Sequence, residues 1–68
     1  MTRDDLIVMM AKAYLDERAD PRSKGADAEE TWRLWGEWAQ NREIVSMRAA
    51  VAAMERAGFA IARVLRGG

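Results

Sequence analysis

Apolar side chains recur at helical spacing from the start of the chain. Residues 3–18 contain no Gly or Pro and are rich in Leu, Met, Ala, Lys and Glu, which favour helices. Thr2 can cap the first turn, and Asp4 and Asp5 suit the positive end of the helix dipole. The pattern predicts a helix over 3–18, ended by Asp20-Pro21. The expected buried face is centred on Leu6, Met10, Ala13 and Tyr14, with Met9 and Ile7 on its flanks. Val8 and Leu15 widen this face further.

A second apolar pattern follows the polar loop 20–27. Asp27, with Glu30 three positions later, has the spacing of a capping box. We predict a helix over 28–40, with Trp32 and Trp35 on a core-facing side and Leu34 and Trp38 paired on another. Gly36 is unfavourable inside a helix. We therefore expect it to admit a close neighbour such as the first helix.

A third helix is predicted over 43–57. Its stripe of apolar side chains is Ile44, Met47, Val51 and Met54. Asn41 can cap this helix, so we favour a break at 40–42, although nothing there forbids one continuous helix. Gly58 followed by Phe59 is typical of a helix C-terminal cap. The tail after Gly58 is compatible with a short strand or a last helical turn.

These patterns together predict an all-α fold in a single domain, residues 1–68. The expected architecture is a small three-helix bundle or a helical hairpin with a short C-terminal tail. A chain of 68 residues without Cys has no disulfide framework, so it depends on helix packing or on association with another chain. A homodimer is one form that such association can take.

Composition and charge exclude several function classes. The chain has neither Cys nor His, so thiolate chemistry, the commonest metal ligands and a histidine base are absent. Eleven cations balance eleven anions, which argues against a dedicated nucleic-acid binder. The first half has six cations and eight anions, and the second half five cations and three anions. We expect no signal peptide and no membrane span, hence a cytoplasmic protein.

The remaining reactive side chains do not form a recognisable catalytic pattern. No base lies at a spacing that would pair it with Ser23, Ser46 or Tyr14. The paired acids are sequence neighbours, so on a helix they point about 100° apart. A calcium loop starting at Asp20 would place Arg22 and Lys24 where oxygen ligands are needed. The sequence predicts no enzyme activity, no cofactor, no metal site and no small-molecule substrate.

The aromatic and basic residues are the better candidates for function. Trp38 and Leu34 can form an exposed patch of the kind enriched in interface hot spots, although packing of Trp38 inside the molecule is an equal alternative. Arginines of the last helix and tail are further contact candidates. A helix-turn-helix built around a turn at 40–42 is the alternative that would bind DNA or RNA. The candidate partner-binding residues are Leu34, Trp38, Arg48, Arg56 and Arg63.

Two segments carry a resemblance to a group of known proteins. The start MTRDDLI and the run MRAAVAAMERAGFAI, with a Trp-bearing middle, resemble small helical proteins of unknown function encoded by phages and prophages. The resemblance implies a non-enzymatic accessory protein that binds and inhibits a host protein or ribonucleoprotein complex, as anti-CRISPR inhibitors do. A structural subunit of a phage particle is the remaining alternative.

Overall fold

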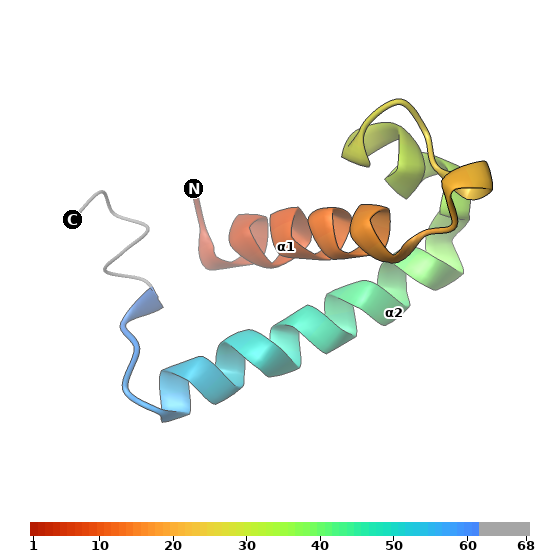
Figure 1. The fold of residues 1–68 in the computed structure, drawn as a ribbon. Helices are drawn as coiled ribbons and strands as arrows, with labels where there is room; N and C mark the ends of the chain where they lie inside the picture. Colours follow the sequence, from red (N-terminus) through yellow and green to blue (C-terminus); the bar gives the residue numbers. More distant parts are fainter. Residues whose placement is uncertain (62–68) are drawn as a thin grey trace.

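The described part of the chain, residues 1–61 of the computed structural model, folds into an antiparallel pair of helices. These are α1 (Arg3–Arg18) and α2 (Ala28–Arg56), joined through a short 3-10 turn, η1 (Pro21–Ser23). In Figure 1 the N-terminus lies near the C-terminal end of α2, and no strand occurs within residues 1–61. The all-α prediction and its hairpin form are confirmed, whereas a three-helix bundle is not supported.

Both ends of α1 follow from local sequence. The Thr2 hydroxyl accepts a hydrogen bond from Asp5 N at 3.1 Å, and Asp5 Oδ2 accepts one from Thr2 N at 3.0 Å. The pKa of the Asp5 carboxyl is lowered mainly because the Thr2 backbone N–H donates to it and so favours its charged form. The helix ends at Arg18, shortly before Pro21, as predicted. Asp27 caps α2 by accepting from Glu30 N at 2.9 Å, also as predicted.

The break in the second half of the chain lies at Gly36, not at residues 40–42. Gly36 has φ 79° and ψ 179° inside α2, a combination that is essentially restricted to glycine. It divides α2 into a short arm (28–35) and a long arm (37–56). The predicted helices 28–40 and 43–57 therefore have a wrong boundary. The glycine is needed for its backbone conformation and not for close packing. A Cβ at Gly36 would meet nothing within 4 Å, so the expected close neighbour is absent among residues 1–61.

The bend leaves carbonyl groups at the end of the short arm without their helical donors. Gln40, in the first turns of the long arm, supplies one replacement, because its Nε2 donates to the Trp32 carbonyl at 2.8 Å. Trp35 supplies a second contact at the bend by donating its indole N–H to the Ser23 carbonyl at 3.1 Å. The Gln40 bond thus joins the two arms across the bend, and the Trp35 bond joins the end of the short arm to η1.

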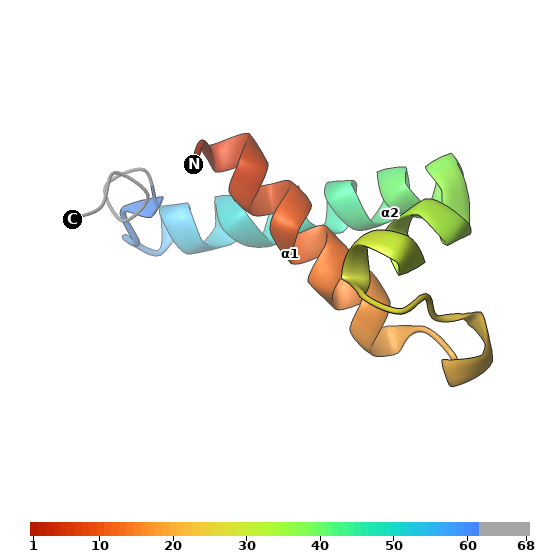
Figure 2. The ribbon, with the colours of Figure 1, turned by 90° about the horizontal axis from the view of Figure 1, so that it is seen from above.

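The two arms enclose the C-terminal half of α1. In Figures 1 and 2 the short arm lies against the opposite side of α1 from the long arm, and α1 crosses the long arm at an angle. The fully buried Thr31 joins the short arm to α1, since its hydroxyl donates to Asp16 Oδ1 at 2.7 Å. Lys12 adds an ion pair to Glu29 at 2.6 Å. These contacts make the short arm part of the hairpin's packing.

At the open end of the hairpin, Arg3 and Glu55 join the two helices. Arg3 donates from Nη2 to Glu55 Oε1 at 2.8 Å and from Nε to Oε2 at 3.1 Å. This two-bond contact lowers the pKa of the Glu55 carboxyl, because the guanidinium favours the charged form.

Small aliphatic side chains, not tryptophans, form the buried core. On α1 the buried residues are Ile7, Ala11 and Leu15, which repeat at i, i+4 and i+8. This face is turned by about one residue from the predicted one, and Met9 and Tyr14 are exposed. Ala39 and Val51 complete the core from the long arm.

The tryptophans therefore correct the predicted core. Trp32 and Trp35 are only partly buried. The small side chains between the helices let the two backbones approach closely, so a large ring does not fit between them. The predicted stripe of the last helix has the right orientation: Val51 is fully buried, and Ile44, Met47 and Met54 are partly buried.

The C-terminal end of α2 has the predicted glycine cap. Gly58 has φ 103°, Gly58 N donates to Glu55 O, and Phe59 N donates to Met54 O, each at 3.1 Å. This is the Schellman arrangement of a helix end. The backbone of Phe59 folds back onto the last turn, but its side chain is 63% exposed. Most of the tail, whose conformation the sequence left open, lies outside the described residues.

The observed α1 face predicts unequal costs for two substitutions on the same helix. Leu15→Ala should lower the free energy of unfolding by about 3 kcal/mol, because it empties a fully buried site. Met9→Ala should change it by less than about 0.5 kcal/mol, since Met9 is 48% exposed. Urea unfolding followed by circular dichroism measures both. Equal effects would contradict the assigned face.

The bend predicts a stereochemical result at Gly36. Gly36→Ala should destabilise the hairpin by about 1–3 kcal/mol, because an L-residue is strained at this backbone conformation. D-alanine, introduced by chemical synthesis, has the mirror-image preference and should retain the stability of the natural chain. Thermal unfolding compares the three proteins. Equal destabilisation by both alanines would indicate that the methyl group, not the backbone, is responsible.

Candidate functional site

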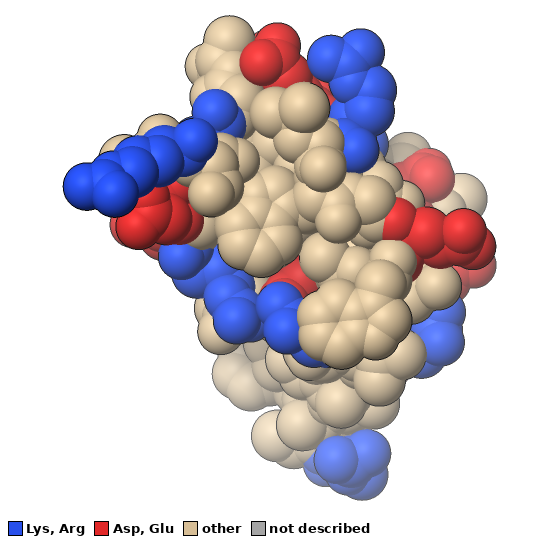
Figure 3. All heavy atoms as spheres, turned by 90° about the vertical axis from the view of Figure 1, so that its right-hand side faces the viewer, with Lys and Arg blue, Asp and Glu red and all other residues tan. Residues whose placement is uncertain are grey.

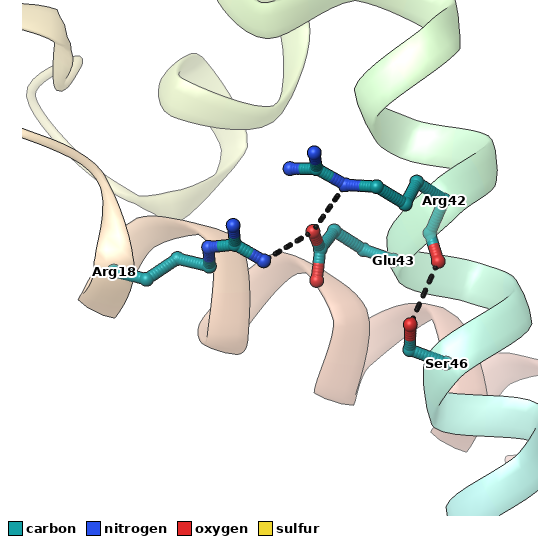
Figure 4. Close-up of polar contacts among 4 residues, drawn as sticks. All are labelled: Arg18, Arg42, Glu43 and Ser46. Atoms are coloured by element: carbon teal, nitrogen blue, oxygen red, sulfur yellow. Dashed lines mark hydrogen bonds and ion pairs between the residues drawn. The ribbon is translucent and has the colours of Figure 1, made fainter.

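The least expected feature of the structure is a carboxylate buried between the two helices. Glu43 is 1% exposed and extends from the long arm of α2 towards α1. Its Oε1 accepts from Arg18 Nη1 at 2.9 Å and from Arg42 Nε at 3.2 Å, as Figure 4 shows. Its Oε2 has no hydrogen-bond partner within the described chain. One oxygen therefore positions two guanidinium groups from different helices.

Helical spacing explains why Glu43 is buried. It follows the buried Ala39 by one turn and precedes Met47 by one turn, so it belongs to the core-facing side of the long arm. Arg18 lies in the last turn of α1 and reaches Glu43 from there. Glu43 is not among the residues predicted from the sequence. Its only signal was a charged residue at helical spacing from the apolar stripe, which also describes an ordinary residue at the edge of a helix face.

Each of the two arginines also lies over an aromatic ring of its own helix. The guanidinium carbon of Arg42 is 4.8 Å from the centre of the Trp38 ring, and that of Arg18 is 5.5 Å from the centre of the Tyr14 ring. Both pairs have i, i+4 spacing, which places the side chains on one helix face, and both distances are typical of cation–π contacts. Trp38 and Tyr14 thus flank the two arginines. We call Arg18 and Arg42, with Glu43 between them, the arginine pair.

An apolar hollow adjoins the arginine pair on the outer side of the long arm. It has a volume of about 380 Å³. Trp38 is 73% exposed there, and Val45, one further residue of the same helix face, is 62% exposed. We call the lining residues the Trp38 face: Trp38, Asn41, Arg42, Val45 and Ser46. Figure 3 looks at this end of the molecule and shows basic side chains next to aromatic rings.

The structure settles only whether Trp38 is exposed or packed, which the sequence pattern left open: its side chain is exposed. Leu34 is also exposed, at 60%, but it does not line the hollow. The predicted pairing of Leu34 with Trp38 needs an unbroken helix, and Gly36 interrupts it.

The other candidates are the arginines. Arg48 and Arg56 are exposed on the long arm, and neither forms an ion pair with a described residue. Arg63 lies outside the described residues. The arginine that the structure adds is Arg42, which belongs both to the Trp38 face and to the arginine pair.

The helix-turn-helix interpretation is wrong for this chain. It requires a tight turn at residues 40–42, and the structure places these residues within the long arm of α2.

The structure brings none of the candidate reactive side chains together with a base in the described part of the chain. The Ser46 hydroxyl donates to the Arg42 carbonyl at 3.0 Å, and no hydrogen bond joins the Ser23, Ser46 or Tyr14 side chain to a carboxylate or a lysine within residues 1–61. No group of three His, Cys, Asp or Glu residues with the arrangement of a metal site occurs there. A second hollow, of about 460 Å³, lies beside the short arm and is lined partly by Asp27, Glu29 and Glu30.

Comparisons with known proteins return no relative. No family model, no curated protein and no solved structure matches the chain. Within the described residues, no helix has the length and apolar character needed to span a membrane. Arguments about function therefore depend on the geometry of the Trp38 face and the arginine pair.

The arginine pair predicts that Glu43 is retained at a cost in stability. A buried carboxylate loses its hydration, and one of its oxygens has no partner in the described chain, whereas Arg18 and Arg42 are 45% and 38% exposed and do not need it for solvation. Glu43→Met should therefore raise the free energy of unfolding by about 1 kcal/mol. Glu37→Met, at an exposed position of the same helix, should change it by less than about 0.5 kcal/mol.

Chemical denaturation with a two-state fit measures both variants. A clear loss of stability in Glu43→Met, with no change in Glu37→Met, would contradict this interpretation. It would show that the two ion pairs outweigh the desolvation of the carboxylate.

Proposed function

We propose that this chain is a non-enzymatic protein-interaction module that binds its partner through the Trp38 face. The observation that carries the proposal is the 73% exposure of Trp38 on a regular helix, beside an apolar hollow. A large aromatic side chain left in solvent gives up the stabilisation of burial. Tryptophan in such a position is the residue type most enriched among interface hot spots.

The geometry around Trp38 supports a binding role more than a packing role. The ring is fixed from one side by the Arg42 guanidinium, 4.8 Å from its centre, and Arg42 is itself bonded to the buried Glu43. A side chain that is already ordered loses less conformational entropy when it binds. The Trp38 face is thus pre-organised for binding.

The identity of the partner class remains a prediction from the sequence resemblance. On that basis the partner is a host protein or ribonucleoprotein complex, and the chain acts as a phage or mobile-element inhibitor of anti-CRISPR type. Inhibition would consist of occupying a surface of that complex. This fits a small module without a catalytic arrangement in its described residues.

Affinity capture from a bacterial lysate tests the proposal. The tagged natural chain should retain a protein that Trp38→Ala loses, because truncating a hot-spot residue costs about 2 kcal/mol or more of binding free energy. Phe59→Ala is the matched control, since Phe59 is a similarly exposed aromatic residue, at 63%, outside the Trp38 face.

Circular dichroism should show the same helicity for all three proteins. Retention of the same proteins by Trp38→Ala would remove the assignment. Recovery of nucleic acid that nuclease treatment eliminates would favour the DNA- or RNA-binding alternative. An assembly of many copies of the chain alone would favour a structural subunit.

A further inference from the structure

The arginine pair has unused hydrogen-bonding capacity. Within the described chain, Arg18 donates only from Nη1 and Arg42 only from Nε, and both bonds end on the same carboxylate oxygen of Glu43. Two positive charges thus face one negative charge. The remaining N–H groups belong to side chains that are 45% and 38% exposed. A guanidinium in this state can still form charge-assisted bonds to a carboxylate from outside.

The apolar hollow and the arginine pair share one residue. Arg42 belongs to both, because it lines the hollow and bonds to Glu43. A ligand that reaches the Arg42 guanidinium therefore lies directly beside Trp38 and Val45. Such a site matches a ligand with an anionic group next to an apolar group.

We propose that the Trp38 face and the arginine pair form one recognition site for an acidic segment of another protein. A carboxylate of that segment binds Arg18 and Arg42, and a neighbouring apolar side chain enters the hollow beside Trp38. This proposal rests on the proposed function and gives the chemistry of the partner. Glu43 is a positioning residue in it: it holds both guanidinium groups and does not touch the partner.

Charge complementarity favours an acidic protein over a second copy of this chain. The long arm exposes Arg48 and Arg56 in addition to Arg42, and helical spacing places Arg56 on the same side as Trp38. Of the three glutamates on the long arm, Glu43 and Glu55 are already bonded to arginines, and Glu37 is exposed. Two copies that met through this face about a two-fold axis would bring like charges together.

Only the charge of the whole chain disfavours nucleic acid at this site, because Arg18 and Arg42 can bind phosphates and the Trp38 ring can stack on a base. The chain as a whole has zero formal net charge, whereas nucleic-acid affinity depends mainly on many released counterions and therefore on excess positive charge.

A displayed library of random peptides tests the proposal across many candidate sequences at once. The natural chain serves as bait, and binders that also bind Trp38→Ala are removed. The enriched peptides should contain Asp or Glu close to Leu, Phe or Trp, and their affinity should fall with added salt, because the carboxylate contacts are partly exposed.

Variants of the chain locate the contacts of one enriched peptide, labelled with a fluorophore. Arg42→Gln and Trp38→Ala should each weaken binding about tenfold or more, by loss of the charged contact and of the apolar contact respectively. Arg18→Gln provides a second test of the charged contact. Arg22→Gln, which removes an exposed arginine in η1, should leave the affinity unchanged.

Glu43→Met separates positioning from stability. It should fold at least as well as the natural chain, yet bind the peptide several-fold more weakly, because both guanidinium groups lose their common anchor. A purely structural role of Glu43 would leave the affinity unchanged.

Three results would overturn the inference. These are enrichment of uncharged or basic peptides or of none, equal affinity of Arg42→Gln and the natural chain for acidic peptides, and tighter binding to duplex DNA than to any peptide. A concentration-dependent dimer that Trp38→Ala abolishes, seen by analytical ultracentrifugation, would also overturn it in favour of a second copy.

The proposed function can survive such a result. If Trp38→Ala still loses a captured protein while the peptide library yields no acidic binder, the module binds a partner of different chemistry. If Trp38→Ala loses nothing in either experiment, both proposals fall.

Discussion

The burial of one carboxylate determines how the exposed part of this molecule is arranged. Glu43 places a negative charge between the two helices, and a charge shielded from water needs opposite charges close by. Arg18 meets that need from α1, and Arg42 meets it from the neighbouring position on α2. Because both arginines remain partly exposed, the same contact that makes the burial tolerable also fixes two cations at the surface, beside two aromatic rings.

The bend at Gly36 makes this arrangement possible. An unbroken α2 would meet α1 along a single line, whereas the bend lets the short arm bind the other side of α1 through Thr31 and Asp16. The C-terminal half of α1 is then enclosed, and Arg18 at its end is directed towards the long arm. With so small an aliphatic core, the polar contacts between elements account for much of the specificity of the hairpin. A helical pair of this size without them would have several similar ways to pack.

In the proposed recognition site, the Trp38 face and the arginine pair have different physical roles. The exposed Trp38 ring and the hollow beside it offer apolar area, which contributes affinity. The arginines offer direction, because a planar guanidinium discriminates carboxylates by geometry. A binding surface of this composition needs no catalytic group. Its function depends on a partner that complements both parts at once.

The sequence by itself determined the helical class, the first helix and its caps, the end of α2 at Gly58, and the orientation of the Val51 stripe, because these depend on interactions between residues a few positions apart. Only the tertiary structure decided which face of α1 is buried, since apolar residues surround most of that helix. It also decided that Gly36 bends the chain, that tryptophans lie outside the core, and that Glu43 is buried between Arg18 and Arg42. These outcomes depend on contacts between residues distant in sequence, such as the 25 positions that separate Arg18 from Glu43, and no local pattern encodes them.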